Sequence, residues 1–172
     1  MPESPVEIVA RVAQVLDALG VPYVVGGSLA SSAHGVARTT NDVDLVADLR
    51  PEHAAALVEQ LGPEFYIEPS TVLDAIRRGA SFNVVHYDTA FKVDIFVAGA
   101  GVFEHCELAR REPGEFEGVR LYFASPEDIL PAKLRWYRDG GEVSDRQWQD
   151  ILGVVRTQGD DLDRDYLQEW AR

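Results

Sequence analysis

Gly26-Gly27-Ser28 and Asp42-Val43-Asp44 are the two short stretches that decide how this chain folds. The first closes an apolar run over 21–25, and the second opens another over 43–47. Glycine lets the backbone come close to a ligand, and a serine that caps a helix stands beside free N–H groups that favour phosphate. Two carboxylates two residues apart on a strand point to the same face. The pattern therefore predicts a phosphate-binding turn beside a pair of carboxylates of the kind that hold Mg²⁺ next to a nucleotide triphosphate.

A later apolar run supplies a third acid. Over 91–97 three aliphatic residues alternate with Lys92, Asp94 and Phe96, so Asp94 faces away from the aliphatic row, alongside Lys92. A carboxylate in so apolar a run needs either solvent or a partner. A salt bridge to Lys92 or an exposed strand face would satisfy it without any function.

Helical and strand patterns alternate along the chain up to about residue 124. Ser4-Pro5-Val6-Glu7 is a capping box, and the helix that it opens should end before Gly20. Periodicity and turn residues predict further helices over 28–35, 51–61 and 71–78, and strands over 21–25, 43–47, 65–67, 82–87, 91–97 and 119–123. We expect these elements to form one mixed α/β body.

The chain after residue 124 has a helical texture. Ser125-Pro126-Glu127-Asp128 is a second capping box, and Asp139-Gly140-Gly141 should end the helix that it opens. Two more helices are predicted, one starting at 144 or 145 and one over about 162–170. The apolar residues Ile129, Leu130 and Leu134 need a surface to bury against, so we expect this tail to pack on the α/β body.

Composition narrows the class of protein. The chain has 172 residues, 46% of them hydrophobic, which suits one domain, or one domain plus a small appendage, with a real core. Its net charge of −13 argues against broad electrostatic binding to nucleic acid. No apolar run reaches the roughly 18 residues of a membrane helix, the N-terminus does not look like a signal peptide, and Cys106 is the only cysteine. We expect a cytoplasmic protein with no membrane partner.

The order of these motifs resembles the nucleotidyltransferase superfamily, which has the DNA polymerase β-like fold. Its signature is a Gly-Gly/Ser turn, a short helix, an acid-x-acid strand and a third acid on a later strand. In this chain the signature falls on Gly26, Gly27, Ser28, Asp42, Asp44 and Asp94. The stretch 34–45 and the tail are similar to a small prokaryotic branch that includes abortive-infection and toxin-type nucleotidyltransferases. The resemblance implies an α+β fold, with a core over 1–124 and a C-terminal helical segment over 125–172 packed on it.

The resemblance also implies metal-assisted chemistry. Asp42 and Asp44 would hold Mg²⁺, which bridges the oxygens of the triphosphate of a bound NTP. Asp94 would hold a second Mg²⁺ with them, or act as the base toward the attacking hydroxyl.

Phosphate contacts are implied for five further residues. Gly26, Gly27 and Ser28 would bind the β- and γ-phosphates through backbone N–H groups and the serine hydroxyl. Arg38 and Lys133 are the cations best placed to steady the phosphate charge, and Lys133 is expected to face the nucleotide cleft. Arg38 as a plain loop cation, and Lys133 as a helix-surface cation paired with Asp128 or Glu127, are the alternatives without function.

Three functions compete at this point. The first is transfer of a nucleoside monophosphate to RNA, such as a tRNA end, or to a partner protein, with an antitoxin as a further partner. The second is modification of a small molecule such as an aminoglycoside antibiotic, which an acidic cleft would favour because the compound is cationic. The third is a module that binds nucleotide without turnover, against which the three intact acids argue.

Overall fold

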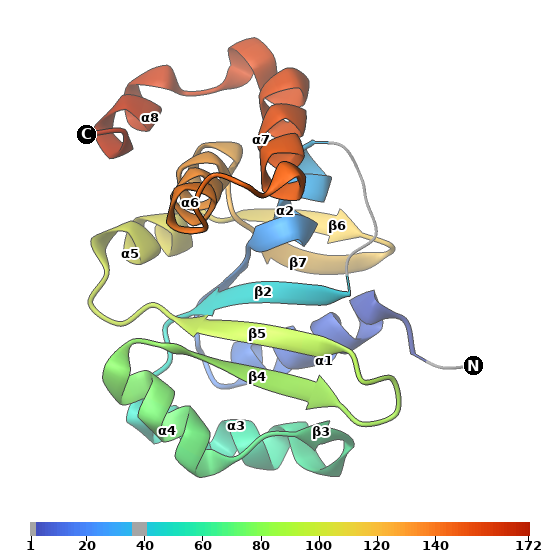
Figure 1. Cartoon of the computed structure of the whole chain (residues 1–172). Helices are drawn as coiled ribbons and strands as arrows, with labels where there is room; N and C mark the ends of the chain where they lie inside the picture. The colour runs from blue at the N-terminus through green and yellow to red at the C-terminus, as the bar shows by residue number, and fades with distance from the viewer. Residues whose placement is uncertain (1–2, 36–40) are drawn as a thin grey trace.

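The computed structural model describes residues 3–35 and 41–172, apart from the side chains of Ser28 and His34. Within these residues the centre of the molecule is a seven-stranded mixed sheet with the order β3-β4-β5-β2-β1-β7-β6 (Figure 1). The strands are β1 (Tyr23–Val25), β2 (Asp42–Ala47), β3 (Phe65–Tyr66), β4 (Ser81–His86), β5 (Lys92–Val97), β6 (Glu112–Phe116) and β7 (Val119–Phe123). The predicted α+β class, a mixed sheet flanked by helices, is confirmed.

The pairing around β2 sets the register of the sheet. β2 runs parallel to β5 and antiparallel to β1, and β1 runs parallel to β7. Val43, Leu45 and Ala47 of β2 are all buried, whereas Asp42 is exposed and Asp44 is partly buried. Because strand side chains alternate, β2 turns its aliphatic row to one face of the sheet and its acids to the other.

Helices cover both faces of the sheet. In Figure 1, α1 (Pro5–Ala18) lies behind the sheet and α3 (Ala54–Leu61) lies at its lower edge, below β4, whereas α2 (Gly27–His34), α6 (Pro126–Asp139) and α7 (Asp145–Gln158) lie in front of it. The remaining helices are α4 (Pro69–Arg78), α5 (Val102–Ala109) and α8 (Arg164–Trp170), with short 3₁₀ turns η1 (Pro51–His53), η2 (Gly62–Glu64) and η3 (Gly159–Asp161).

The capping box at Ser4 starts α1 as the sequence predicts. The Ser4 hydroxyl accepts from the Glu7 N–H at 3.3 Å, and the Glu7 carboxylate accepts from the Ser4 N–H at 2.7 Å. Val9, Val12 and Leu16 follow at helical spacing and are completely buried in the core that the sheet shares with α1. Burial of each such side chain stabilises the fold by roughly 1.5–3 kcal/mol.

The tail is helical from Pro126 onward, as its capping residues predict. The hydroxyls of Ser125 and Ser144 accept from the N–H groups of Asp128 and Gln147 and so start α6 and α7. Ile129 and Leu130 are buried, but Leu134 is 45% exposed, so the expectation that Leu134 packs on the body is wrong. No helix in the described ranges is long and apolar enough to cross a membrane.

Helix α2 is the element that joins the tail to the sheet. It packs on β2 as well as on α6 and α7. At its C-terminal end a Cβ placed on Gly35 would lie 2.9 Å from backbone atoms of Gly153 and Val154 in α7. The backbones of α2 and α7 therefore meet at a point where there is no room for a side chain on Gly35.

Two elements were missing from the prediction. β6 contains Pro113 and Gly114, which are typical of loops, yet it pairs with β7 as the last strand of the sheet. Proline is tolerated there because an edge strand leaves one side of its backbone unpaired. Helix α5 has a weak apolar period, and its Val102 is exposed, so its pattern did not distinguish a helix from a loop.

Candidate active site

The register of β2 and β5 brings the three predicted acids to one face of the sheet. Asp44 and Asp94 occupy paired positions on these parallel strands, and Asp42 is paired with Lys92. Paired residues of neighbouring strands project to the same side, and so do residues two apart on one strand. Asp42, Asp44, Lys92 and Asp94 therefore share the face of the sheet that α2 covers.

The start of α2 lies directly against the Asp44 carboxylate. The Gly26 N–H donates to the Asp44 carbonyl oxygen at 2.9 Å. Gly27 has a φ of +57°, and a Cβ placed on it would lie 2.1 Å from Oδ2 of Asp44. Position 27 thus needs glycine both for its left-handed backbone and for the approach of the carboxylate. The first turn of the helix and the acid are held in contact, which favours an anion together with its counter-cation here.

Electrostatic repulsion is concentrated on Asp44. Burial, then Asp94, then Asp42 raise the pKa of the Asp44 carboxyl from 3.8 to about 6, while Lys133 and Lys92 lower it. The carboxyl is therefore surrounded by other acids in a partly desolvated place. A bound cation would relieve this repulsion.

One carboxylate oxygen of Asp94 has no partner in the part of the chain that the structure describes. Its Oδ2 lies 3.1 Å from the Lys92 amine, and its Oδ1 is buried with no hydrogen-bond partner among the described residues. All three acids offer hard oxygen ligands, which is the donor set that Mg²⁺ prefers. The residues present therefore fit a magnesium ion, although in ranges 3–35 and 41–172 no three His, Cys, Asp or Glu side chains are already arranged to hold one.

Lys133 lies inside the α6–α7 pair. It is 4% exposed, and its amine donates to Asp150 Oδ2 at 2.9 Å and to Gln147 Oε1 at 3.0 Å. The positive charge of Lys133 lowers the pKa of the Asp44 carboxyl. The two partners on α7 account for the burial of this amine, and the expectation that Lys133 faces the nucleotide cleft stays a prediction.

The remaining predicted residues are placed only in part. Gly26 and Gly27 stand at the start of α2 as described, and the backbone of Ser28 belongs to the same helix. Arg38, the other predicted phosphate-binding cation, lies outside the described residues.

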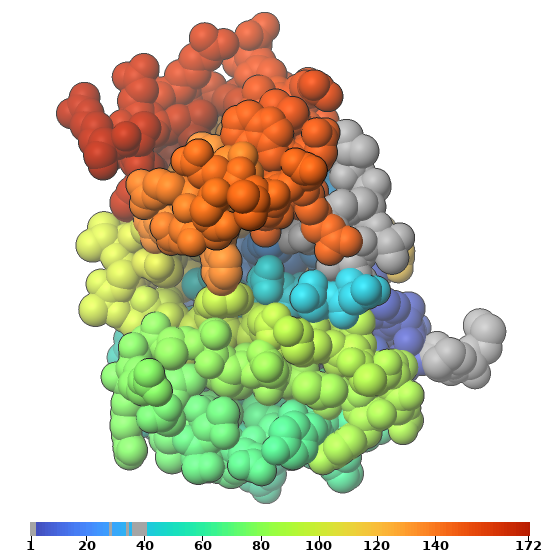
Figure 2. Space-filling model, viewed as in Figure 1, coloured from blue at the N-terminus to red at the C-terminus, as the bar shows by residue number. Residues whose placement is uncertain are grey.

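An open hollow runs along the acid face. Figure 2 shows the surface recessed between the α6–α7 segment and β5, with atoms of β2 along it. Trp136 of α6 is 58% exposed and sits edge-on against Phe96 of β5, with the ring centroids 5.6 Å apart. Phe96 follows Asp94 by two residues, so this aromatic pair borders the acids. The sequence prediction assigned Trp136 no role, because its contact depends on how α6 crosses the sheet.

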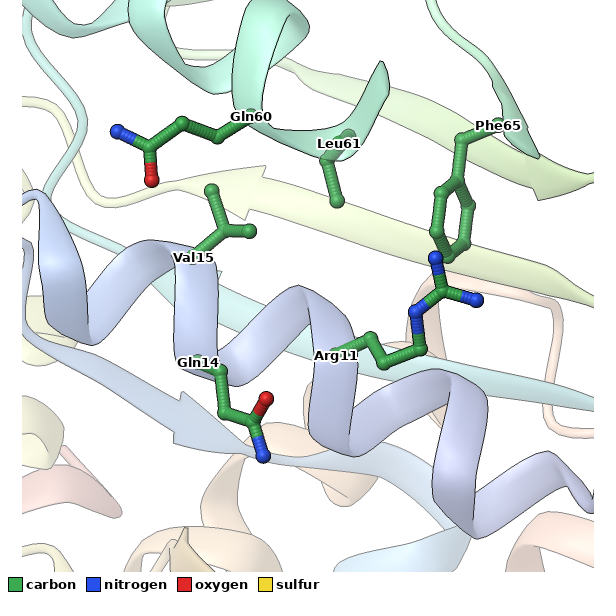
Figure 3. Close-up of a pocket in the computed structure, with 6 residues that line it drawn as sticks. All are labelled: Arg11, Gln14, Val15, Gln60, Leu61 and Phe65. Carbon is green, nitrogen blue, oxygen red and sulfur yellow. The ribbon is translucent and has the colours of Figure 1, made fainter. Parts of the chain in front are cut away.

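A second hollow lies on the far side of the sheet. It measures about 250 Å³ and lies between α1 and α3, lined by Arg11, Gln14, Val15, Gln60, Leu61 and Phe65 (Figure 3). Arg11 forms ion pairs with Glu3 and Glu64 and lies over the Phe65 ring, so its charge is already matched. This pocket has none of the predicted site residues.

Comparisons with known proteins agree on the fold. No protein-family model and no curated protein sequence matches the chain. Solved structures do match, including the crystal structure of ANT(2")-Ia in complex with adenylyl-2"-tobramycin, at 17% identity over 96% of each chain with a TM-score of 0.62. The lincosamide antibiotic adenylyltransferase LnuA, lincomycin-bound, matches at 12% identity over 90% of this chain and 96% of its own, with a TM-score of 0.56. A putative nucleotidyltransferase from Thermotoga maritima matches at 16% identity over 84% and 92%, with a TM-score of 0.55. At these identities the likeness establishes the architecture, and this chain has the nucleotidyltransferase fold.

Proposed function

We propose that this protein is a Mg²⁺-dependent nucleotidyltransferase, which moves a nucleoside monophosphate from an NTP to a hydroxyl acceptor. The observation that carries the proposal is the pairing of Asp44 with Asp94 on parallel strands, with the Asp44 carboxylate held against Gly27 at the start of α2. This puts carboxylates beside the N–H groups of a helix start, which is what a metal–triphosphate complex needs.

Each residue of the site has a proposed task. Asp42 and Asp44 would hold Mg²⁺, which would supply positive charge to balance the charge that develops on the phosphate oxygens. The Gly26 N–H is used by the Asp44 carbonyl, so phosphate binding falls to the N–H groups that begin at Gly27. The acceptor oxygen bonds to the α-phosphorus, the bond to the bridging oxygen breaks, and pyrophosphate leaves. Asp94 fits two roles, as a ligand of a second Mg²⁺ or as the base that takes the hydroxyl proton.

The tail completes the proposed site. We assign residues 1–124 to the catalytic core and 125–172 to a helical segment that forms one wall of the nucleotide cleft. Lys133 supports this because its buried positive charge already acts on Asp44. It would steady the triphosphate from within the α6–α7 pair rather than from solvent.

The acceptor that the observations favour is a small cationic molecule bearing a hydroxyl. Two of the solved structures with this fold are described with an antibiotic or its adenylyl derivative, and both match this chain over most of its length. The net charge of −13 also suits a cationic compound and opposes a polyanion. RNA or a partner protein, with an antitoxin, is the competing acceptor class that the toxin-type resemblance implies.

A labelling experiment tests the proposal. Each α-³²P-labelled NTP is incubated with the protein and Mg²⁺, alone, with total tRNA, with tobramycin and with lincomycin. We expect label on one of the small molecules together with release of pyrophosphate, and neither with Asp44→Asn or without Mg²⁺. Label on tRNA or on protein would favour the macromolecular acceptor. Mg²⁺-dependent binding of nucleotide with no pyrophosphate release in any arm would leave the non-catalytic module as the function.

A further inference from the structure

The only two lysines of the chain, Lys92 and Lys133, both act on the acid cluster. All other basic side chains apart from the histidines are arginines. Both lysines lower the pKa of Asp44, although they come from different elements, β5 and α6. Lys133 is buried and bonded to Asp150, whereas the Lys92 side chain is 40% exposed at the open side of the acid face.

Lys92 sits among the acids because of the sheet register. It pairs with Asp42 across β2 and β5, and it precedes Asp94 by two residues on the same face. Its amine lies 3.1 Å from Oδ2 of Asp94. The pairing of the two parallel strands therefore places the Lys92 ammonium on the same face as the three carboxylates.

We propose that Lys92 is a built-in counter-cation that takes the place of a second divalent ion at this site. Its ammonium lies against Oδ2 of Asp94 and supplies positive charge where a second Mg²⁺ would bind, so the site holds one divalent ion, on Asp42 and Asp44. The inference rests on the proposed function and decides between the two roles open to Asp94. Lys92 is a positioning residue in this scheme, since it acts through Asp94.

The chemistry of the side chains supports this assignment. An ammonium group carries a compact positive charge that can neutralise a neighbouring carboxylate. A divalent ion ligated by Asp94 Oδ2 would face this like charge at close range. The other oxygen of Asp94, Oδ1, is buried and has no hydrogen-bond partner in the described part of the chain, so it is left for one donor such as the acceptor hydroxyl.

Manganese binding tests the inference without relying on turnover. Free Mn²⁺ is measured by electron paramagnetic resonance during titration of the whole chain, with and without a non-hydrolysable α,β-methylene NTP analogue. We expect wild type to bind one Mn²⁺ per chain. Lys92→Met should bind a further Mn²⁺, or bind Mn²⁺ with an apparent Kd at least about tenfold lower, because a repelling charge is gone. Lys92→Arg should stay close to wild type in both measures.

The control variant removes one positive charge from another part of the molecule. Arg78 is exposed on α4, a helix that packs on α3 and β4, and it forms an ion pair with Asp74 at 3.3 Å, so Arg78→Met should leave Mn²⁺ binding unchanged. Circular dichroism melts verify folding, and Lys92→Gln replaces Lys92→Met if the latter does not fold.

Three results overturn the inference. Two Mn²⁺ ions bound to wild type would do so, as would a Lys92→Met variant with the wild-type number of sites and Kd; in either case nucleotidyl transfer by wild type would still support the proposed function. No Mn²⁺ bound by any variant, with or without the analogue, would overturn the inference together with the metal requirement of the proposed function.

Discussion

At the scale of single residues, the contact between Gly27 and Asp44 is the tightest constraint of the site. The glycine meets two demands, a positive φ and a missing side chain, whereas most turn glycines meet only the first. Gly79 offers a clean comparison, since its φ is +59° but a Cβ there would meet nothing within 4 Å. Substitutions at Gly27 and Gly79 can therefore separate the cost of backbone strain from the cost of displacing the Asp44 carboxylate.

We expect Gly27→Ala to lose nucleotide binding, because the added methyl group pushes the Asp44 carboxylate away from the helix start. Gly79→Ala should destabilise the fold by about 1 kcal/mol from its backbone alone and keep nucleotide affinity. Urea unfolding and titration with Mg²⁺ and ATP measure the two effects. Equal nucleotide affinity in the two variants would show that the close contact at position 27 has no bearing on binding.

At the scale of elements, α6 and α7 are joined through a buried ion pair. Lys133 and Asp150 have side chains that are each 5% exposed, and their charged atoms lie 2.9 Å apart. Breaking a buried pair by removing one partner costs about 3–5 kcal/mol, while replacing both by apolar groups often costs little. Stability and function therefore depend on this pair in different ways.

Asp150→Ala should lower the free energy of unfolding by about 3–5 kcal/mol, since it leaves the Lys133 ammonium buried with less compensation. The double variant Lys133→Met/Asp150→Leu should regain most of that stability and still bind nucleotide poorly, because the positive charge is gone. Chemical denaturation and nucleotide titration separate these outcomes. A double variant with wild-type nucleotide affinity would reduce Lys133 to a structural residue.

Glu107 on α5 makes stability depend on pH. Burial, then the charges of Asp128 and Glu104, raise the pKa of its carboxyl from 4.5 to about 8. Between these values the folded chain holds a proton that the unfolded chain has lost, so the stability contributed by this group is full below about pH 4.5 and is lost as the pH rises through about 8. Glu107→Gln should therefore exceed wild type in free energy of unfolding by at least about 1 kcal/mol at pH 8, and by less at pH 5.

Urea unfolding at several pH values checks this expectation. Glu112→Gln is a matched control, because Glu112 is exposed on the edge strand β6. A constant difference between Glu107→Gln and wild type from pH 5 to pH 9 would contradict the assigned cause.

How much of the structure could be predicted from the sequence also depends on the scale of the feature. Strand alternation was enough to put Asp42 and Asp44 on one face, and capping residues were enough to start α1, α6 and α7. The pairing of Asp44 with Asp94 needed the strand order, which a local pattern does not contain. The partners of Lys133 were missed for a similar reason, since Gln147 and Asp150 reach it only through the turn between α6 and α7. Local periodicity thus identifies elements and faces, while contacts between distant elements come from packing.

At the scale of the whole molecule, a polar cluster holds the C-terminal helix. The Tyr166 hydroxyl of α8 donates to the Asp128 carboxylate, and the Arg110 guanidinium lies 3.8 Å from the centre of the Tyr166 ring. The Asp163 N–H donates to Glu127 Oε1 at 2.9 Å. These contacts tie α8 to the start of α6, the helix that carries Lys133 and Trp136. The last helix of the tail is therefore held against the start of its first helix.

The meeting of Gly35 with the backbone of α7 gives helix α2 a mechanical part in the molecule. One end of this helix bears on the Asp44 carboxylate and the other on Gly153 and Val154, which makes it a rigid strut about 12 Å long. A short rigid helix that is in tight contact at both ends moves as one body. We therefore expect a shift of α7 at Gly153 and Val154 to move the first N–H groups of α2 relative to the acids, so that the alignment of the site depends on a contact at the far end of this helix.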